Sequence, residues 1–298
     1  MNLLFQTPVA VARRLAGAVL GLPSPLEGRT VLITGASSGI GEATAYAVAE
    51  RGGRLLLVAR RAEELERVRR AVEERGGTAE AWTVDLTDEE AVASFVEEVL
   101  ARYGAVDYLV NNAGRSIRRS LELSYERIHD FERTMAINYF GPLRLILGLL
   151  PAMRAQRFGH VVNIVTWGVQ MKAPKFSAYI ASKTALDTFS RIAGRETFGD
   201  NVTFTNVRMP LVRTGMIAAT EAYSTAPAMS VEQAAHVIVR ALEERPITIS
   251  VPVAKLTEVV TLVAPRLTDA LAWMGARQFP DSAAARAAAA APATTESR

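Results

Sequence analysis

Short apolar runs alternate with longer amphipathic segments between Arg29 and Pro252, and this alternation restricts the possible folds more than any other feature of the sequence. Uninterrupted runs of Val, Leu and Ile are typical of parallel strands that are covered by helices on both faces. The predicted strands are Thr30–Thr34, Arg54–Val58, Ala79–Val84, Asp107–Val110, His160–Val165, Val202–Val207 and Ile247–Val251. The predicted helices are Gly39–Arg51, Ala62–Arg75, Asp88–Tyr103, Tyr125–Gln156, Ala178–Phe198 and Val231–Glu244. The sequence therefore predicts an α/β protein with a doubly wound, seven-stranded parallel sheet and helices on both faces.

This alternation defines one domain over residues 28–252, and the chain extends beyond it on both sides. Residues 253–281 contain two apolar segments separated by Pro265, so we expect short helices that pack on the domain or over its ligand cleft. Residues 282–298 are rich in alanine and have too little varied apolar surface to pack. They are predicted to form a mostly disordered tail that is helical at most at its start.

The N-terminal extension, residues 1–27, has no acidic residue before its last position. Within residues 7–22, a threonine that can cap a helix precedes a proline suited to the first turn, and apolar residues recur at helical spacing opposite two arginines. These features predict an amphipathic helix. Two interpretations are open: the helix docks on the body of the protein, or it makes peripheral contact with a membrane surface.

Composition excludes several classes of function. The chain has no cysteine, which excludes disulfides, thiolate catalysis and cysteine-based zinc sites and is compatible with a cytoplasmic protein. His129, His160 and His236 are far apart in the sequence, so we expect no metal site. The net charge is only +3 and the basic residues are dispersed, so we expect no binding of nucleic acid.

A glycine-rich loop follows the first predicted strand and precedes a helix. Glycine permits a tight turn and lets backbone N–H groups approach a pyrophosphate at the positive end of the helix. The spacing is G-x-x-x-G-x-G, which differs from the commonest dinucleotide-binding motif. The alternative is that this loop is a glycine-rich connection that binds no ligand. The residues expected to contact a cofactor are Gly35, Ser37, Ser38, Gly39, Ile40 and Gly41.

The end of the second strand indicates which dinucleotide binds. An acidic residue there would hold a ribose 2′-hydroxyl, but this chain has Arg60 and Arg61, which suit the 2′-phosphate of NADP. The alternative is that both are solvated arginines at the start of a helix. Asp85 has two interpretations: it accepts a hydrogen bond from an adenine amino group, or it caps the helix that begins after Thr87. Leu86, the next residue, is a further expected cofactor contact.

Tyr179 and Lys183 lie four residues apart in a predicted helix and therefore share a face. A nearby ammonium favours the phenolate, so this tyrosine can act as an acid or base near neutral pH. The same spacing is also common on solvated helix faces, where it has no function.

With these motifs the chain resembles the short-chain dehydrogenase/reductase family, over about residues 28–252. The matching motifs, in the family's order, are Gly35-x-x-x-Gly39-x-Gly41, Asn111-Asn112-Ala113-Gly114, Asn138 and Tyr179-x-x-x-Lys183. The resemblance implies a Rossmann fold that binds NADP(H), with Tyr179 as the general acid in carbonyl reduction. It also implies that Lys183 lowers the tyrosine pKa and binds the nicotinamide ribose, that Asn138 holds a proton-relaying water, and that the protein is a homodimer or homotetramer.

Two positions depart from the family pattern. Thr166 stands where the family has a catalytic serine; its hydroxyl can still donate to a substrate carbonyl, although the β-branched side chain is stiffer. The alternative is that Thr166 has only a structural role and that the enzyme is slow or has an altered activity. The usual Pro-Gly is Pro210-Leu211, and the resemblance implies that Pro210 shapes this turn while Thr214 meets the nicotinamide carboxamide.

More locally, the chain resembles a bacterial branch that includes the reductase domain of fatty acyl-CoA reductases, which implies a long-chain acyl-CoA or fatty aldehyde as the substrate. The residues expected to line an apolar cleft are Trp167, Met171, Phe176, Met216 and Ile217; ordinary core packing is the alternative. Arg115, Arg118 and Arg119 are interpreted as a solvated basic loop, or as contacts to a CoA phosphate. Competing functions are reduction of a steroid, polyketide or small ketone, and a non-catalytic NADP-binding sensor or structural protein.

Overall fold

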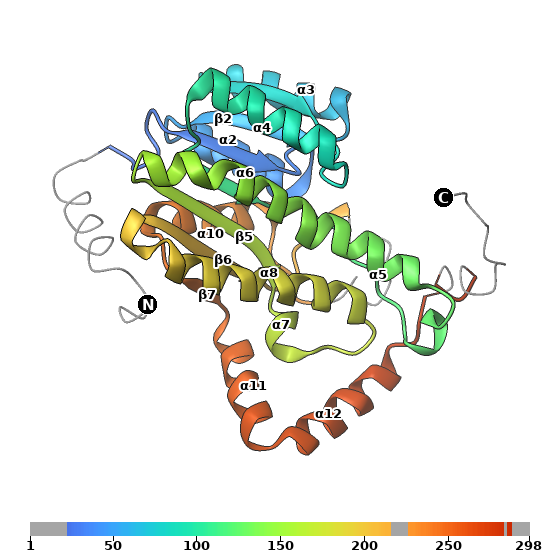
Figure 1. The fold of residues 1–298 in the computed structure, drawn as a ribbon. Coiled ribbons are helices and arrows are strands. Elements are labelled where there is room, and N and C mark those ends of the chain that lie inside the picture. The colour runs from blue at the N-terminus through green and yellow to red at the C-terminus, as the bar shows by residue number, and fades with distance from the viewer. Residues whose placement is uncertain (1–22, 216–225, 283–284, 288–298) are drawn as a thin grey trace.

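The computed structural model describes residues 23–215, 226–282 and 285–287, and its centre is a parallel sheet (Figure 1). The strands are β1 (Thr30–Thr34), β2 (Arg54–Ala59), β3 (Thr78–Thr83), β4 (Tyr108–Asn111), β5 (Gly159–Thr166), β6 (Val202–Met209) and β7 (Thr248–Ser250). Their order is β3-β2-β1-β4-β5-β6-β7, and every neighbouring pair is parallel. The predicted doubly wound, seven-stranded sheet is confirmed, and the order reverses between β1 and β4, where such folds bind ligands.

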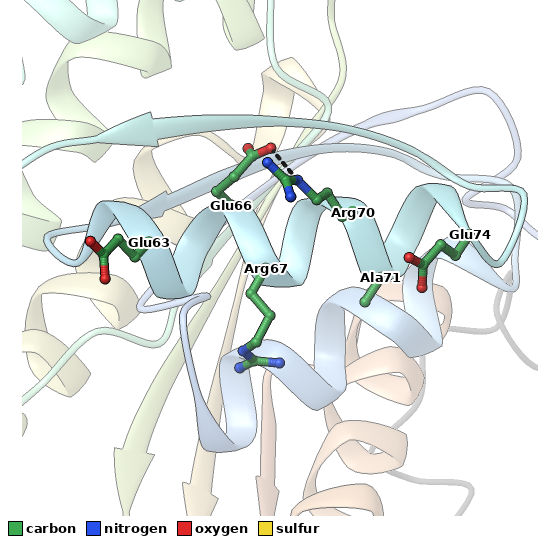
Figure 2. A pocket seen from close by; sticks show the side chains of 6 residues that line it. All are labelled: Glu63, Glu66, Arg67, Arg70, Ala71 and Glu74. Atoms are coloured by element: carbon green, nitrogen blue, oxygen red, sulfur yellow. Dashed lines mark hydrogen bonds and ion pairs between the residues drawn. The ribbon is translucent and has the colours of Figure 1, made fainter.

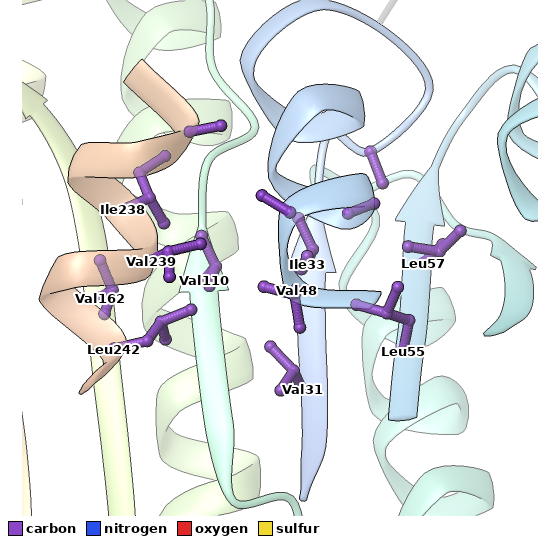
Figure 3. Packing of buried hydrophobic residues seen from close by; sticks show 14 of the residues in the cluster. Val31, Ile33, Val48, Leu55, Leu57, Val110, Val162, Ile238, Val239 and Leu242 are labelled. Atoms are coloured by element: carbon purple, nitrogen blue, oxygen red, sulfur yellow. The ribbon is translucent and has the colours of Figure 1, made fainter. Parts of the chain in front are cut away.

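Helices cover both faces of the sheet. On one face lie α2 (Gly39–Ala49), α3 (Ala62–Glu73) and α10 (Val231–Glu244), and on the other lie α4 (Glu89–Tyr103), α6 (Gly141–Ala155) and α8 (Ser177–Glu196). Side chains alternate between the two faces along each strand. Val31 and Ile33 of β1 pack with Val48 of α2 and Ile238 of α10, as Figure 3 shows, whereas Leu32 belongs to the second core.

One predicted helix has an interruption. The segment predicted as a single helix from Tyr125 to Gln156 consists of α5 (Ile128–Met135), a π-helical turn η3 (Ala136–Phe140) and α6. Its full length, Ile128–Ala155, is long and apolar enough to cross a membrane by length and composition. Core helices of globular proteins pass the same test, and α6 buries apolar side chains such as Leu145 and Leu149 against the sheet.

Three helices lie at the carboxyl edge of the sheet. A short helix α7 (Gly168–Met171) follows β5, and α11 (Pro252–Val263) and α12 (Pro265–Gln278) follow β7. Each of the last two begins with a proline, which suits the first turn of a helix. In Figure 1 they form a V-shaped arm that projects from the body around α7. We call α11 and α12 together the arm.

Other predicted segments are described only in part. The predicted amphipathic helix at residues 7–22 lies outside the described residues. At the start of the alanine-rich segment, the Ser282 hydroxyl accepts a hydrogen bond from the Ala285 N–H, and residues 285–287 are helical. Residues 283–284 and 288–298 lie outside the described part of the chain.

Candidate active site

The glycine loop joins β1 to α2 and is packed against the loop that follows β4. Gly35 has a φ of +66°, a conformation that side chains disfavour, and a Cβ there would lie 2.9 Å from the Ala113 Cα. A Cβ on Gly41 would lie 2.3 Å from the Gly35 carbonyl oxygen and 2.7 Å from the Asn112 Nδ2. Glycine is therefore required at both positions for the turn to close.

The loop after β4 is fastened to the end of β1. The Thr34 hydroxyl accepts hydrogen bonds from the backbone N–H groups of Asn112 and Ala113, each at 3.0 Å, and donates to the Val110 carbonyl. The Asn112 side chain donates to the Thr34 carbonyl at 2.9 Å. Asn112, expected to contact the cofactor, is therefore a brace for the glycine loop in this structure.

The two arginines after β2 lie beside the glycine loop. Arg61 donates from its Nη2 to the hydroxyls of Ser37 (3.2 Å) and Ser38 (2.8 Å). Arg60 is about two-thirds exposed, and its guanidinium lies 3.6 Å from the Asp85 carboxylate. Arg61 is thus directed at the loop and is not simply solvated, and Arg60 keeps exposed donors beside it.

Asp85 has a different local role from helix capping. Its Oδ1 accepts from the backbone N–H and the hydroxyl of Thr87, whereas Asp88 accepts from the Ala91 N–H and caps α4. The interpretation of Asp85 as the helix cap was therefore wrong. Burial works to raise the pKa of Asp85, but these hydrogen bonds and the charge of Arg60 outweigh it and lower the pKa. The neighbouring Leu86 side chain is buried in the core.

Asn138 lies in the π-helical turn and is completely buried. Its Oδ1 accepts from the Arg115 N–H at 2.8 Å, and its Nδ2 donates to the Arg115 carbonyl at 2.8 Å and to the Ser182 hydroxyl at 3.0 Å. Both amide hydrogens are engaged, so the side chain fixes the loop after Gly114 against α8. A Cβ on Gly114 would lie 2.9 Å from Asn138 Oδ1 and 3.2 Å from Lys183 Nζ, which brings these three residues together.

Lys183 is a buried cation. Its side chain is 4% exposed, and its Nζ donates to the Ile164 carbonyl of β5 at 2.8 Å. Among the described residues, no carboxylate forms an ion pair with it. Burial lowers the pKa of Lys183 to about 8. A buried ammonium without a carboxylate partner costs folding free energy, so such a group marks a functional site.

Tyr179 lies one turn before Lys183 on α8 and is partly exposed. Its ring makes an edge contact with Phe176, with ring centres 6.4 Å apart, and its backbone carbonyl accepts from the Ser182 hydroxyl. Ser182 thus connects Tyr179 to Asn138. Sequence analysis missed this serine, although its position on the buried face between Tyr179 and Lys183 was a usable signal.

Thr166 ends β5 at the same edge of the sheet. Its Oγ1 accepts from the Gly168 N–H at 3.1 Å, which leaves the hydroxyl hydrogen able to donate to a substrate. A Cβ on Gly168 would lie 3.0 Å from the Ile180 side chain and 3.3 Å from the Thr166 methyl. The start of α7 therefore packs between Thr166 and the first turn of α8, next to Tyr179.

The remaining predicted contacts are only partly described. Trp167, Met171 and Phe176 are partly buried around α7, on the side of the sheet edge that carries Thr166. The Thr214 methyl lies against the glycine loop, 3.4 Å from where a Gly39 Cβ would be. After Pro210 the chain pairs through Val212 with Met229. Met216 and Ile217 lie outside the described residues.

One hollow of about 430 Å³ lies on the outer surface of α3 (Figure 2). Its lining residues are Glu63, Glu66, Arg67, Arg70, Ala71 and Glu74. Arg70 is paired with Glu66 there, and Arg67 reaches Glu42 at the start of α2. This is a helix surface with paired charges, and it has no groups for carbonyl chemistry.

The site residues fit a nicotinamide dinucleotide. The glycine loop leaves room for close approach of a pyrophosphate at the start of α2, Arg60 and Arg61 flank it, and the buried Lys183 lies further along the same edge of the sheet. At this edge the carboxyl ends of β1, β4 and β5 meet. The predicted positions Thr166, Tyr179, Lys183 and Asn138 are brought together, while Arg118 and Arg119 instead bind the C-terminal chain.

Comparison with known proteins agrees with this geometry. The sequence model of the short chain dehydrogenase family matches residues 29–224. An uncharacterized oxidoreductase of Mycobacterium tuberculosis is 48% identical over 95% of this chain and 85% of that protein. A protein named fatty acyl-CoA reductase from Acinetobacter baylyi is 46% identical over 87% of this chain and 88% of that protein.

Solved structures give the same result. A short-chain dehydrogenase from Streptomyces avermitilis superposes with a TM-score of 0.69 at 32% identity, covering 85% of this chain and 99% of that chain. A metagenomic short-chain oxidoreductase in complex with NADP has a TM-score of 0.65 at 29% identity, covering 76% and 97%. The chain therefore belongs to the short-chain dehydrogenase/reductase family of oxidoreductases, which act on CH–OH and C=O groups.

Proposed function

We propose that this protein is an NADPH-dependent reductase that transfers hydride to the carbonyl carbon of a long-chain apolar substrate, a fatty acyl-CoA or fatty aldehyde, with Tyr179 as the general acid. The observation that carries the proposal is the buried Lys183 ammonium one helical turn from Tyr179 and against Gly114 and Asn138. Burying this ammonium costs folding free energy, which supports a functional role for it beside Tyr179.

The charges beside the glycine loop support NADPH as the cofactor. Arg61 reaches the Ser37 and Ser38 hydroxyls and Arg60 remains largely exposed, so both guanidinium groups can meet a 2′-phosphate. The second strand ends without a carboxylate that would hold a ribose diol. The relatives of known structure include one described in complex with NADP.

In the proposed reaction, bound NADPH supplies the hydride. The Tyr179 hydroxyl donates a proton to the carbonyl oxygen as that oxygen becomes an alkoxide, so an aldehyde gains one hydride and one proton and becomes an alcohol. A fatty acyl-CoA gains the same hydride and proton to give a hemithioacetal, which releases the CoA thiol and leaves the aldehyde. The positive charge of Lys183 stabilises the phenolate that remains. The Thr166 hydroxyl, which accepts from Gly168 and has its own hydrogen to give, donates to the same carbonyl oxygen. Asn138 contributes to proton relay beside this centre.

An apolar substrate is supported by two observations. Trp167, Met171 and Phe176 lie around α7 next to Thr166 and Tyr179. A relative with 46% identity over most of both chains is named fatty acyl-CoA reductase. An aliphatic chain attached to the reacting carbonyl would bury its methylene groups against side chains of this kind.

Assembly and location follow as further parts of the proposal. Phe140, Leu147 and Ile192 are exposed apolar residues on the helices that follow β4 and β5, and they support a homodimer or homotetramer formed through these helices. We place the protein in the cytoplasm, with residues 7–22 as the segment that can contact a membrane surface.

The decisive experiment compares a long-chain acyl-CoA, a long-chain aldehyde and cyclic ketones at equal NADPH, with NADH in parallel. We expect NADPH oxidation with the first two and loss of at least about a hundredfold in kcat for Tyr179→Phe, because the acid is removed and the ring is kept. Activity confined to cyclic ketones would defeat the acyl proposal. NADPH binding without any turnover would identify a sensor, and a Tyr179→Phe protein with most of its turnover would refute the role of the tyrosine.

A further inference from the structure

Three basic side chains near the site bind residues that follow the arm. Arg118 donates from Nη2 to the Phe279 carbonyl at 2.7 Å and from Nη1 to the Pro280 carbonyl at 3.0 Å. Arg119 donates to the Ala285 carbonyl at 2.9 Å. Lys175 donates to the Phe279 carbonyl at 2.6 Å. The interpretation of Arg118 and Arg119 as a solvated basic loop was therefore wrong, because residues more than 160 positions away occupy their donors.

One carboxylate completes this cluster. The Asp281 Oδ1 accepts from the Ser120 N–H at 3.0 Å, and its Oδ2 lies 3.6 Å from the Lys175 ammonium. The side chains of Lys175 and Asp281 are only 15% and 12% exposed, so water screens this pair weakly. We call these contacts the clasp; on one side they involve Arg118, Arg119, Ser120 and Lys175, and on the other Phe279, Pro280, Asp281 and Ala285.

The clasp joins two loops that both lead directly to the catalytic side chains. The Arg119 N–H donates to the Lys175 carbonyl at 2.7 Å, so the loops are also bonded to each other. One loop begins at Arg115, whose backbone is held by Asn138 on both sides. The other continues from Lys175 into Phe176, whose ring lies against Tyr179.

Lys175 has a backbone conformation that needs support. Its φ is +70°, in the left-handed region that disfavours residues with a Cβ. Such a conformation persists only where the surroundings fix it. Here its carbonyl accepts from Arg119 and its ammonium donates to Phe279, so both ends of the residue are held.

The other side of the clasp is anchored in the body of the protein. Arg119 is 10% exposed and lies 3.2 Å from Asp130, a buried carboxylate that also pairs with Arg127 and Arg133. The loop that carries Arg118 and Arg119 is therefore fixed independently of the C-terminal chain, and the Phe279 carbonyl, which accepts from both Arg118 and Lys175, links it to the Lys175 side chain.

From these contacts we propose that Phe279, Pro280, Asp281 and Ala285 form a positioning segment of the active site, which keeps Phe176 beside Tyr179 by holding the Lys175 side chain and the Arg119 loop that is bonded to the Lys175 carbonyl. This inference rests on the proposed catalytic function of Tyr179. It assigns substrate positioning to a C-terminal segment that touches neither the glycine loop nor Lys183 in the described structure.

The test uses the full chain with two matched double variants. Arg118→Ala with Asp281→Ala removes the Arg118 bonds to Phe279 and Pro280 and both Asp281 contacts of the clasp. Arg277→Ala with Asp269→Ala removes the same two residue types from α12, where Arg277 stacks on Trp273. With dodecanal and NADPH, we expect the clasp variant to raise the aldehyde KM about tenfold, the equivalent of about 1.4 kcal/mol. We expect its kcat and its KM for NADPH to stay within about threefold, and the control to match the wild type.

Hydrogen exchange provides a second readout that does not depend on the substrate. Backbone amides of residues 173–178 should exchange about tenfold faster in the clasp variant than in the control, because local opening becomes easier. If the wild type fails to reduce dodecanal, the proposed function fails. The exchange comparison still tests whether the C-terminal segment holds residues 173–178 in place. If the double variant does not fold, Asp281→Asn, which keeps an acceptor for Ser120 and loses the charge facing Lys175, is measured in the same way.

Two results would overturn the inference. A lower melting temperature with unchanged aldehyde KM and unchanged exchange in residues 173–178 would mean that the segment only stabilises the arm. Equal losses in kcat and in affinity for NADPH would mean that the substitutions disturb the whole site.

Discussion

Replacing Lys183 by methionine removes a buried ammonium and keeps a side chain of similar length. Burial lowers the pKa of this lysine from its usual 10.5 to about 8, which means that the folded state holds the proton less tightly than the unfolded state. A difference of about 2.5 pKa units corresponds to about 3 kcal/mol of folding free energy at pH 7, where both states are protonated. The wild type bears this cost and the variant does not.

The net effect is smaller because one hydrogen bond is also lost. Lys183 Nζ donates to the Ile164 carbonyl, and leaving that carbonyl unpaired costs about 1 kcal/mol. We therefore expect Lys183→Met to raise the free energy of unfolding by about 2 kcal/mol at pH 7 while it abolishes reduction. As pH rises from about 8 to 10.5, the folded wild type loses its proton before the unfolded chain does, so the wild type gains stability and the advantage of the variant disappears.

The assay is urea unfolding of the cofactor-free protein at several pH values between 7 and 10.5, at one protein concentration because assembly would shift the apparent stability. Lys172→Met is the matched control: this lysine is exposed, and the change should stay within about 0.5 kcal/mol. A Lys183→Met protein that is less stable than the wild type at pH 7, or a difference that does not depend on pH, would refute the reasoning.

Substitutions at three other positions test the site. Gly114→Ala places a Cβ 2.9 Å from Asn138 Oδ1 and should lower kcat by about tenfold or more, because the hydrogen bonds of the Asn138 amide prevent it from moving away. Gly275→Ala is the control in the same assay, because nothing lies within 4 Å of its added Cβ, and it should leave kcat unchanged. Arg61→Ala should raise the KM for NADPH about tenfold and leave that for NADH nearly unchanged, and equal effects on both cofactors would contradict the 2′-phosphate assignment. Thr166→Val should reduce kcat by about a hundredfold and Thr166→Ser by no more than about threefold, whereas equal rates in steady-state assays would show that the hydroxyl has no function.

The strands were predictable because their signal is local. The ends of each predicted strand lie within two residues of those of an observed strand. Most of these strands are runs of Val, Leu and Ile, which need no distant partner to be recognised, whereas β3 reads Thr-Ala-Glu-Ala-Trp-Thr and was recognised by its place in the alternation with helices. The errors fall at strand ends: β5 and β6 extend to Thr166 and Met209, which pair with each other. The polar residues that follow the predicted ends, Thr166 and Arg208, resemble the start of a turn until the neighbouring strand is known.

The site was predictable as a set of positions and less so as a set of contacts. The order and spacing of the motifs predicted which residues meet at the sheet edge. They did not predict that Asn138 would donate its two amide hydrogens to Arg115 and Ser182. Nor did they predict that Asp88, three residues after Asp85, would cap α4. Which of two nearby carboxylates accepts a bond depends on the backbone geometry between strand and helix, and the sequence does not specify that geometry.

The sequence by itself determined the doubly wound sheet, the glycine loop after the first strand and the helical spacing of Tyr179 and Lys183, because periodicity and motif order are properties of neighbouring residues. Only the tertiary structure decided the burial of Lys183, which depends on packing against Ile164 of β5 and lowers its pKa. It also decided that Arg118 binds residues near Phe279, 161 positions later. Contacts over such distances follow from how the chain is folded, and this is why the charge of a side chain could be predicted while its partner could not.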